Sequence, residues 1–347
     1  MPQPDLKVIG SFAFLKRRLA AISVPVVFSL LMAVPSSLSA QSNFTVDSVL
    51  GAVVQVISKI PAEARTARSL GTERDGSGVI IDSDGLVLTI GYAMLEAESI
   101  EIVLSGGKKV SARPIAYDHA SGFGLLRANK KLGIKPVELG NSGDLREKDP
   151  ILVVSHGGRQ AAMPGIVVSR RPFAGSWEYL LERAIYTAPP HPAFGGAGLF
   201  SSTGKLVGIG SLIVADAASP GYATPGNMFV PIDQLKPILG DLLEKGRSAV
   251  PRRPWLGLYA EEIKGRLFVN RIAPGGPASG AGIKQGDLVI GVNGKPVTSL
   301  VDFYRSIWKL GNAGVDVPLD ILQGAKIRKF SVKSSDRYKW LKLDQSY

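Results

Sequence analysis

The sequence predicts a mainly β protein of barrel or sandwich type. Short runs of β-branched residues and leucine recur along the 347 residues, and 40 glycines and 23 prolines supply turns between them. Helical periodicity is confined to a few segments, of which residues 233–246 are the clearest, with Gly246 as the stop. The length allows two or three domains, each with its own core.

In the first half of the chain, residues 44–57 favour a short helix that leads into a strand, and residues 60–75 favour a surface loop. Residues 76–89 form a hairpin pattern around the turn Asp82-Ser-Asp-Gly85. A calcium loop at these two aspartates is the alternative, but the further ligands do not follow in the sequence. Further strands are expected at residues 99–104, 110–117, 124–127, 151–154, 165–169 and 206–212.

The second half contains a smaller unit of about a hundred residues, a usual domain size. Its segment 300–310 has helical periodicity, and a turn is expected at Asn293-Gly294. The basic, proline-containing segment 247–254 fits a linker, and the tail 336–347 fits no element. Strands are expected at residues 267–272, 287–292, 317–322 and 329–332.

The N-terminus has the order of regions that is typical of a secretory signal peptide. Lys16-Arg-Arg18 precedes an apolar run at residues 19–35, and small residues follow up to Ala40. Residues 1–40 are therefore predicted to be a signal peptide, and the mature protein to be periplasmic or secreted. The alternative is an uncleaved membrane anchor through residues 19–35, the one case in which membrane contact is expected.

Composition excludes several kinds of chemistry. The chain has no cysteine, which rules out disulfides, thiol nucleophiles and cysteine-bound zinc, and we expect no cofactor and no metal site. The net charge of +12 is spread along the chain without a basic cluster, so no nucleic-acid partner is expected. The three histidines, His119, His156 and His191, are interpreted as hydrogen-bonded or solvated loop residues.

Several motifs, in their order and spacing, resemble the HtrA (DegP/DegS-like) family over residues 46–332. The resemblance implies a trypsin-like double β-barrel, a serine protease fold, at residues 41–246. It also implies a linker at 247–254, a PDZ domain at 255–335 and a tail at 336–347. The motifs are Gly76 to Thr89, Leu139-Gly-Asn-Ser142, Gly165 to Arg170, Gly204 to Ile209, Trp255-Leu-Gly-Leu258, Gly276-Pro-Ala278, Ala281 to Asp287 and Val292 to Val297.

The resemblance also implies where a catalytic triad would stand, and other residues occupy those positions. The general base position is Tyr92, the position of the orienting carboxylate is Gly122, and the nucleophile position is Gly195. A glycine has no hydroxyl group, and tyrosine, with a pKa of about 10, is a poor base near neutrality. The oxyanion-loop donors would be the N–H groups of Ala193 and Gly195, of which Ala193 would resist a positive φ.

No other residue is expected to replace the triad. Ser201 and Ser202 fall in a hairpin turn at residues 201–204 that faces away from the cleft. The resemblance therefore predicts a pseudoprotease.

The PDZ-like half implies a peptide site. PDZ domains bind an extended peptide as an added strand and hold its terminal carboxylate on backbone N–H groups. The matching loop is Trp255, Leu256, Gly257 and Leu258, with Arg252 and Arg253 nearby as added attraction for a carboxylate. The flanking helix carries Leu300, Phe303, Tyr304 and Ile307. Helical periodicity leaves open which of Phe303, Tyr304 and Ile307 reach the groove and which fill the core.

The expected function is that of a non-catalytic envelope protein in protein quality control. It would bind unfolded or C-terminal peptide segments of envelope proteins as a chaperone, adaptor or regulator. One alternative is an active serine-type endopeptidase with a rearranged site. Another is an inactive subunit, in a homotrimer or in a mixed oligomer with an active relative.

Overall fold

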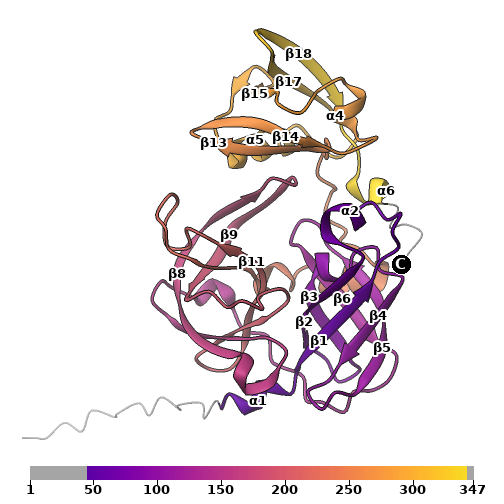
Figure 1. Cartoon of the computed structure of the whole chain (residues 1–347), viewed down its shortest axis with the longest axis vertical. Helices are drawn as coiled ribbons and strands as arrows, with labels where there is room; N and C mark the ends of the chain where they lie inside the picture. The colour runs from indigo at the N-terminus through magenta and orange to yellow at the C-terminus, as the bar shows by residue number, and fades with distance from the viewer. Residues whose placement is uncertain (1–44, 342–347) are drawn as a thin grey trace, which may run out of the picture. The chain divides into compact units, whose positions relative to one another are not determined.

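Six antiparallel strands close the first barrel in the order β1-β2-β3-β6-β5-β4, with β1 paired to β4 (Figure 1). The structure, a computed structural model, describes residues 45–341, so the predicted signal peptide lies outside the described residues. A short helix, α1 (Asp47–Leu50), precedes the barrel as predicted. The strands are β1 (Val53–Lys59), β2 (Glu73–Ile80), β3 (Leu86–Ile90), β4 (Ser99–Val103), β5 (Lys109–Tyr117) and β6 (Phe123–Ala128).

The β2–β3 hairpin confirms the predicted turn at Asp82-Ser-Asp-Gly85. One carboxylate oxygen of Asp82 accepts the backbone N–H groups of Asp84 (2.9 Å) and Leu86 (2.7 Å). The other pairs with the Arg127 guanidinium at 2.7 Å. Both oxygens are engaged in holding the turn, which is the ordinary role of aspartate there.

A second barrel closes in the order β10-β11-β12-β9-β8-β7, with β10 paired to β7. The core on one side of this barrel contains Val153, Ile185, Leu199 and Phe229, all of them buried. The strands β7, β8 and β11 were predicted from the sequence, and β10 was implied by the hairpin turn at residues 201–204, whereas β9 and β12 were missed. The strands are β7 (Pro150–Val154), β8 (Ala162–Gly175), β9 (Tyr179–Ala188), β10 (Gly198–Ser201), β11 (Leu206–Val214) and β12 (Gly226–Pro231).

The hairpin of β8 and β9 is longer than the sequence predicts. The strand expected at residues 165–169 continues to Gly175, and the pairing runs from Ile166–Ala188 to Gly175–Tyr179. Bulges between Val167 and Ser169 and between Arg171 and Phe173 interrupt the alternation, which is the reason that the pattern is not visible in the sequence.

The helix predicted at residues 233–246 is wrong in its first half. The chain makes a 3-10 turn at Ile232–Gln234, and only α3 (Leu239–Lys245) is α-helical. Pro237 disfavours helical backbone at the residue before it, so the regular helix starts later. The predicted stop at Gly246 is confirmed, with φ at 69° and its N–H bonded to the carbonyl of Leu242.

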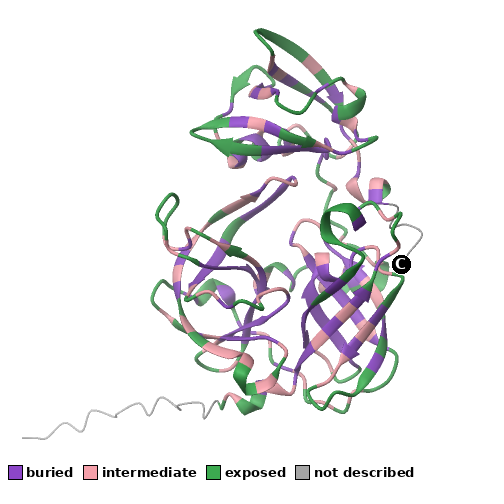
Figure 2. Ribbon diagram, viewed as in Figure 1, coloured by how far each residue is buried: buried purple, intermediate pink, exposed green. Residues whose placement is uncertain are grey.

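The third sheet has the order β13-β14-β15-β17-β18, with β16 paired to β15. Its helix α5 begins after Ser299, whose hydroxyl accepts the N–H of Asp302 at 3.1 Å, an ordinary N-cap. Figure 2 shows the exposed outer strand β18 of this sheet. The elements are β13 (Leu258–Ile263), β14 (Arg266–Ile272), α4 (Pro277–Gly280), β15 (Leu288–Val292), β16 (Lys295–Pro296), α5 (Leu300–Trp308), β17 (Asp316–Gln323) and β18 (Lys326–Lys333).

Besides α4, two short helices lie where the sequence predicted none. The segment expected as a loop at residues 60–75 contains α2 (Ala67–Leu70) and the start of β2. In the tail, α6 (Arg337–Leu341) places Leu341 in a buried cluster with Leu95 and Tyr117. The described residues, 45–341, belong to one compact unit. Within residues 45–341 no helix has the length and apolar character needed to span a bilayer.

Candidate functional site

The glycine-rich loop before β10 is fastened to two neighbouring strands. The carbonyl of Gly195 accepts the N–H of Ser77 on β2 at 2.8 Å, and the N–H of Gly196 donates to the carbonyl of Gly210 on β11 at 2.9 Å. Gly196 has φ at 74°, so the residue with left-handed backbone is Gly196 and the strain considered for Ala193 does not arise. The loop is therefore held rigidly beside β2.

The structure brings Tyr92 and Gly195 together. Tyr92 lies on a 3-10 turn, Gly91–Ala93, that directly follows β3. A Cβ atom placed on Gly195 would lie 3.0 Å from the Tyr92 hydroxyl, which donates a hydrogen bond to the carbonyl of Ser211 at 2.9 Å. Burial raises the pKa of Tyr92 above the usual range of a phenol. The hydroxyl therefore stays protonated and acts as a donor.

Gly122 lies on the other side of the same turn. Its carbonyl accepts the N–H of Gly91 at 2.7 Å, and its φ is 84°. A Cβ atom on Gly122 would lie 3.1 Å from the hydroxyl of Tyr179, which donates to the carbonyl of Ser121 at 2.5 Å. The Tyr179 hydroxyl, from the start of β9, thus occupies the space into which a side chain at position 122 would point.

The N–H of Ala193 is used within its own loop. It donates to Nδ1 of His191 at 3.1 Å, and Nε2 of the same ring lies 3.2 Å from the carbonyl of Ala161. Nδ1 therefore accepts and Nε2 carries the proton, which makes the imidazole neutral. Burial lowers the pKa of His191, in agreement with a neutral ring. Of the two N–H groups implied for an oxyanion site, this one points at a side chain.

His119 and the turn residue Ser201 also have partners in the chain. His119 has Nδ1 2.9 Å from the Tyr117 hydroxyl and Nε2 3.2 Å from the carbonyl of Glu178, and burial lowers its pKa well below the usual value. The hydroxyl of Ser201 lies 2.9 Å from that of Thr203, in the β10–β11 turn.

A serine, a histidine and an aspartate that the sequence analysis did not connect lie beside the Gly195 loop. The hydroxyl of Ser77 lies 3.0 Å from Nδ1 of His156 and accepts the backbone N–H of the same residue, also at 3.0 Å. Nε2 of His156 lies 3.9 Å from the Asp75 carboxylate. Ser77 is 1 % exposed. The contact joins the strand β2 to the end of β7, 79 residues away, which no local pattern announces.

The predicted carboxylate-binding loop holds a carboxylate of the chain itself. The N–H of Leu256 donates to Oε2 of Glu178 at 2.9 Å, and the N–H of Leu258 donates to Oε1 at 3.0 Å. Gly257, between them, has φ at 70°. Glu178 is 4 % exposed, and burial raises the pKa of its carboxyl to about 7. Glu178 was not among the residues predicted from the sequence.

The helix α5 contacts the same hairpin. Phe303, Tyr304 and Ile307 have no exposed surface and share one apolar cluster with Leu180 of β9. The hydroxyl of Tyr304 donates to the carbonyl of Gly175 at 2.7 Å. All three residues therefore lie between the core of this unit and the β8–β9 hairpin, and none presents a free apolar surface.

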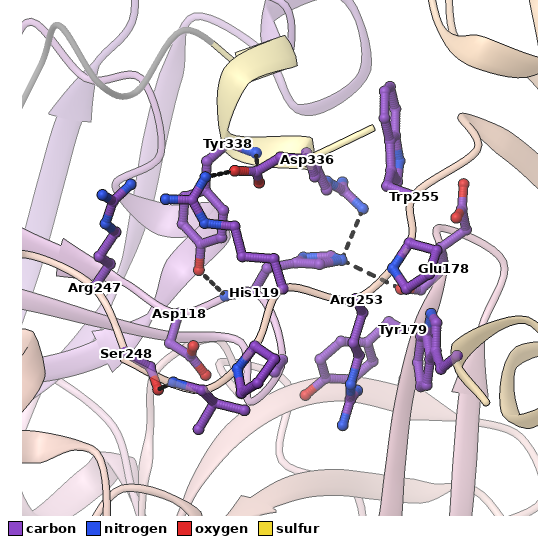
Figure 3. A pocket seen from close by; sticks show the side chains of 17 residues that line it. Asp118, His119, Glu178, Tyr179, Arg247, Ser248, Arg253, Trp255, Asp336 and Tyr338 are labelled. Carbon is purple, nitrogen blue, oxygen red and sulfur yellow. Dashed lines mark hydrogen bonds and ion pairs between the residues drawn. The ribbon is translucent and has the colours of Figure 1, made fainter. Parts of the chain in front are cut away.

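The remaining predicted residues surround a pocket that Glu178 also lines (Figure 3). The backbone of Trp255 pairs with Ser335, and its ring packs 5.0 Å from the ring of Trp340. Arg252 forms an ion pair with Asp336, and the Arg253 guanidinium lies 4.1 Å from the centre of the Trp308 ring. Both arginines are engaged with neighbours. Over residues 45–341 no group of three or more acidic or histidine side chains could hold a metal ion.

Two family models match the chain, a trypsin-like peptidase domain at residues 76–209 and a PDZ domain at residues 254–334. Curated relatives include the periplasmic pH-dependent serine endoprotease DegQ of Escherichia coli K12, 30% identical over 270 residues. Another is a probable periplasmic serine endoprotease, DegP-like, of Bartonella henselae, 29% identical over 276 residues. These alignments cover 72% and 74% of this chain, but 57% and 52% of the relatives' own length.

Among solved structures, the HtrA-type protease AlgW with decapeptide superposes with a TM-score of 0.50 at 18% identity. The alignment covers 84% of this chain and 97% of that one. At this identity the likeness concerns the fold alone, and it confirms the mainly β protease fold followed by a PDZ domain. The chain carries a trypsin-like peptidase domain followed by a PDZ domain, and the matches support its assignment to the HtrA family.

Proposed function

We propose that this chain is a non-catalytic HtrA-like protein that binds polypeptides through the carboxylate-binding loop of its PDZ domain. The observation that carries the proposal is the pair of N–H groups of Leu256 and Leu258, which together hold one carboxylate. The same geometry would accept the terminal carboxylate of a peptide laid along β13. The bound segments would be unfolded or C-terminal regions of envelope proteins.

The arrangement around Gly195 supports the non-catalytic part of the proposal. Acyl transfer to an enzyme needs a nucleophile, a base within hydrogen-bond reach and a group that orients the base. Gly195 offers no hydroxyl, and the Tyr92 hydroxyl donates its proton to a backbone carbonyl. Tyr179 stands where an orienting carboxylate would have to fit beside Gly122. Positions 195, 92 and 122 therefore supply no nucleophile, no general base and no group to orient a base.

The relatives named as periplasmic support a periplasmic or envelope location for this chain. We further propose assembly into a homotrimer or into a mixed oligomer with an active relative. Co-purification of a tagged chain with an HtrA-type protease from the same envelope would test the mixed oligomer. A chain that always purifies alone as a monomer would contradict it.

The proposed function is tested with the mature chain, residues 41–347, and a library of decapeptides. Binding is expected for peptides with an apolar last residue and a free carboxylate. The same peptides with an amidated end should bind at least 10-fold more weakly, since they lack the charge that the two N–H groups hold. Unfolded casein should remain intact beside them. Equal binding of both forms, or casein cleavage by the pure chain, would contradict the proposal.

Replacing Gly195 with serine alone should restore no peptidase activity. The new Cβ atom would lie 3.0 Å from the Tyr92 hydroxyl, and no base or orienting group would accompany the new hydroxyl. Turnover of casein by the Gly195→Ser variant should stay at the background of the parent chain. Appreciable cleavage would mean that Tyr92 or Gly122 does not stand at the triad position assigned to it.

A second candidate function, an active endopeptidase with a rearranged site, rests on Ser77, His156 and Asp75. Their distances of 3.0 and 3.9 Å resemble a serine–histidine–aspartate relay. The hydroxyl of Ser77, however, is buried and already accepts the N–H of His156. We expect no labelling of the chain by a fluorophosphonate probe. Labelling that disappears in the Ser77→Ala variant and persists in Ser201→Ala would favour this second candidate instead.

A further inference from the structure

The carboxylate-binding loop and the helix α5 are both in contact with the tip of the β8–β9 hairpin, residues 175–180. From these contacts we propose that the hairpin is an internal ligand of the PDZ groove, in which the Glu178 side chain takes the place of a peptide's terminal carboxylate. The inference rests on the proposed function, because it concerns the occupancy of the same site. It implies that an external peptide binds only by displacing Glu178.

The contacts of Glu178 are those that a bound terminal carboxylate would make. Two backbone N–H groups that flank a left-handed glycine, those of Leu256 and Leu258, converge on its oxygens at 2.9 and 3.0 Å. A carboxylate 4 % exposed would be costly to bury without such donors. The bonds from Leu256 and Leu258 favour the charged carboxylate and oppose the effect of burial on its pKa. The carboxylate-binding loop is thus occupied by a carboxyl group, that of Glu178.

A second set of contacts holds the rest of the hairpin tip against α5. The Tyr304 hydroxyl accepts the N–H of Glu178 at 3.2 Å and donates to the carbonyl of Gly175 at 2.7 Å. Leu180 is buried in the apolar cluster of α5 and β13, and Ala174 packs against it. The hairpin therefore supplies a carboxylate, backbone groups and an apolar side chain, as a bound peptide does.

The neighbouring residue connects this contact to the triad positions. Tyr179 follows Glu178 directly, and its hydroxyl donates to the carbonyl of Ser121 beside Gly122. Glu178 and Tyr179 are adjacent in the chain. A movement of the hairpin out of the groove would therefore also disturb the hydrogen bond from the Tyr179 hydroxyl to the carbonyl of Ser121. The hairpin tip therefore contacts both the carboxylate-binding loop, through Glu178, and the backbone beside Gly122, through Tyr179.

An internal ligand weakens the binding of external ones. A tethered group faces its site at an effective concentration in the millimolar range. An external peptide binds only the fraction of molecules in which the groove is free, so its apparent dissociation constant rises by the reciprocal of that fraction. Variants that remove the Glu178 carboxylate should then bind peptides more tightly than the parent chain does.

Hydrogen exchange tests the proposal without any peptide. In the mature parent chain the amides of Leu256 and Leu258 should be protected, and in the Glu178→Ala variant they should exchange at least 10-fold faster. Glu178→Gln, which keeps one acceptor oxygen, should be intermediate. The matched control is Glu182→Ala, on the same strand, whose exposed carboxylate pairs with Arg305 of α5 and makes no hydrogen bond to the carboxylate-binding loop. If the amides of Leu256 and Leu258 exchanged at the same rate in the parent chain and in both variants, Glu178→Ala and Glu182→Ala, that result would contradict the proposal that the hairpin is an internal ligand.

A peptide arm separates this inference from the proposed function. A decapeptide with an apolar last residue and a free carboxylate should bind the Glu178→Ala variant at least 10-fold more tightly than the parent or Glu182→Ala. If the peptide binds none of the three while the exchange difference is present, the proposed function fails and the internal ligand stands. If it binds the parent chain and Glu178→Ala equally well, the hairpin does not occupy the groove and the inference fails.

Discussion

Replacing Gly196 with alanine is expected to lower the free energy of unfolding by about 4 kcal/mol or more. A Cβ atom at this position would lie 1.9 Å from the backbone carbonyl oxygen of Ser77 and 2.7 Å from the Thr89 hydroxyl. Neither can move away easily, because the Thr89 hydroxyl is itself bonded to that carbonyl at 2.7 Å. The left-handed φ of 74° adds about 1 to 2 kcal/mol for any residue with a side chain. Urea unfolding followed by circular dichroism measures the loss.

Gly158 provides a control with the same backbone conformation. Its φ is also 74°, and a Cβ atom there would meet nothing within 4 Å. The Gly158→Ala variant should therefore lose only the conformational part, about 1 to 2 kcal/mol. The difference between the two variants isolates the close approach of the Gly195 loop to β2. If both variants are destabilised equally, the loop does not lie against Ser77 as described.

Local chemistry explains which elements could be predicted from the sequence. The turn at Asp82 acts over two to four residues and was predicted from its aspartates and glycine, and α5 was predicted from the helical periodicity of its apolar residues. The strand β9 was missed because Glu182 and Arg183 interrupt its apolar run. The strand β12 was missed because Gly226, Asn227 and Pro231 leave it only a short apolar run, Met228-Phe-Val230. These two segments form strands because they pair with their neighbours in the barrel, although their local sequence pattern is weak.

The residues of the candidate site also differ in how far the sequence predicted them. Order and spacing of motifs identified Tyr92, Gly122 and Gly195 as a related set, and the structure places the three around the turn Gly91–Ala93. Glu178 carries no such signal, since a single acid beside Trp177 and Tyr179 fits an exposed hairpin tip equally well. Its partner N–H groups lie 78 and 80 residues further along the chain. Only the folded arrangement brings a carboxylate to the loop.

Acidification from pH 8 to pH 5 is expected to stabilise the parent chain relative to a Glu178→Gln variant by roughly 3 kcal/mol. Burial raises the pKa of the Glu178 carboxyl from 4.5 to about 7, against the opposing effects of the bonds from Leu256 and Leu258 and of the Arg337 charge. The folded state therefore binds the proton more tightly than the unfolded state does. The stabilisation is complete below pH 4.5 and is lost as the pH rises through 7. One pH unit in this window is worth about 1.4 kcal/mol.

Among the groups that face one another here, Glu178 is the main source of the change in stability between pH 5 and pH 8. Burial raises the pKa of Tyr304 on α5, so its hydroxyl stays neutral from pH 5 to pH 8, and burial lowers the pKa of His119 well below 6.5, which favours its neutral form. Urea unfolding of the parent chain and of Glu178→Gln at each pH measures the difference, and every other titrating group contributes equally to both.

The same titration bears on peptide binding, because Glu178 is protonated more readily in the groove than in solvent. Raising the pH above 7 charges the buried carboxylate and weakens the docking of the hairpin, whereas the terminal carboxylate of a peptide is charged throughout this range. Peptide affinity of the parent chain should then increase from pH 5 to pH 8, and that of Glu178→Gln should change much less. Parallel stability curves of the two proteins would mean that Glu178 titrates as a solvent-exposed acid, outside the loop of Leu256 and Leu258.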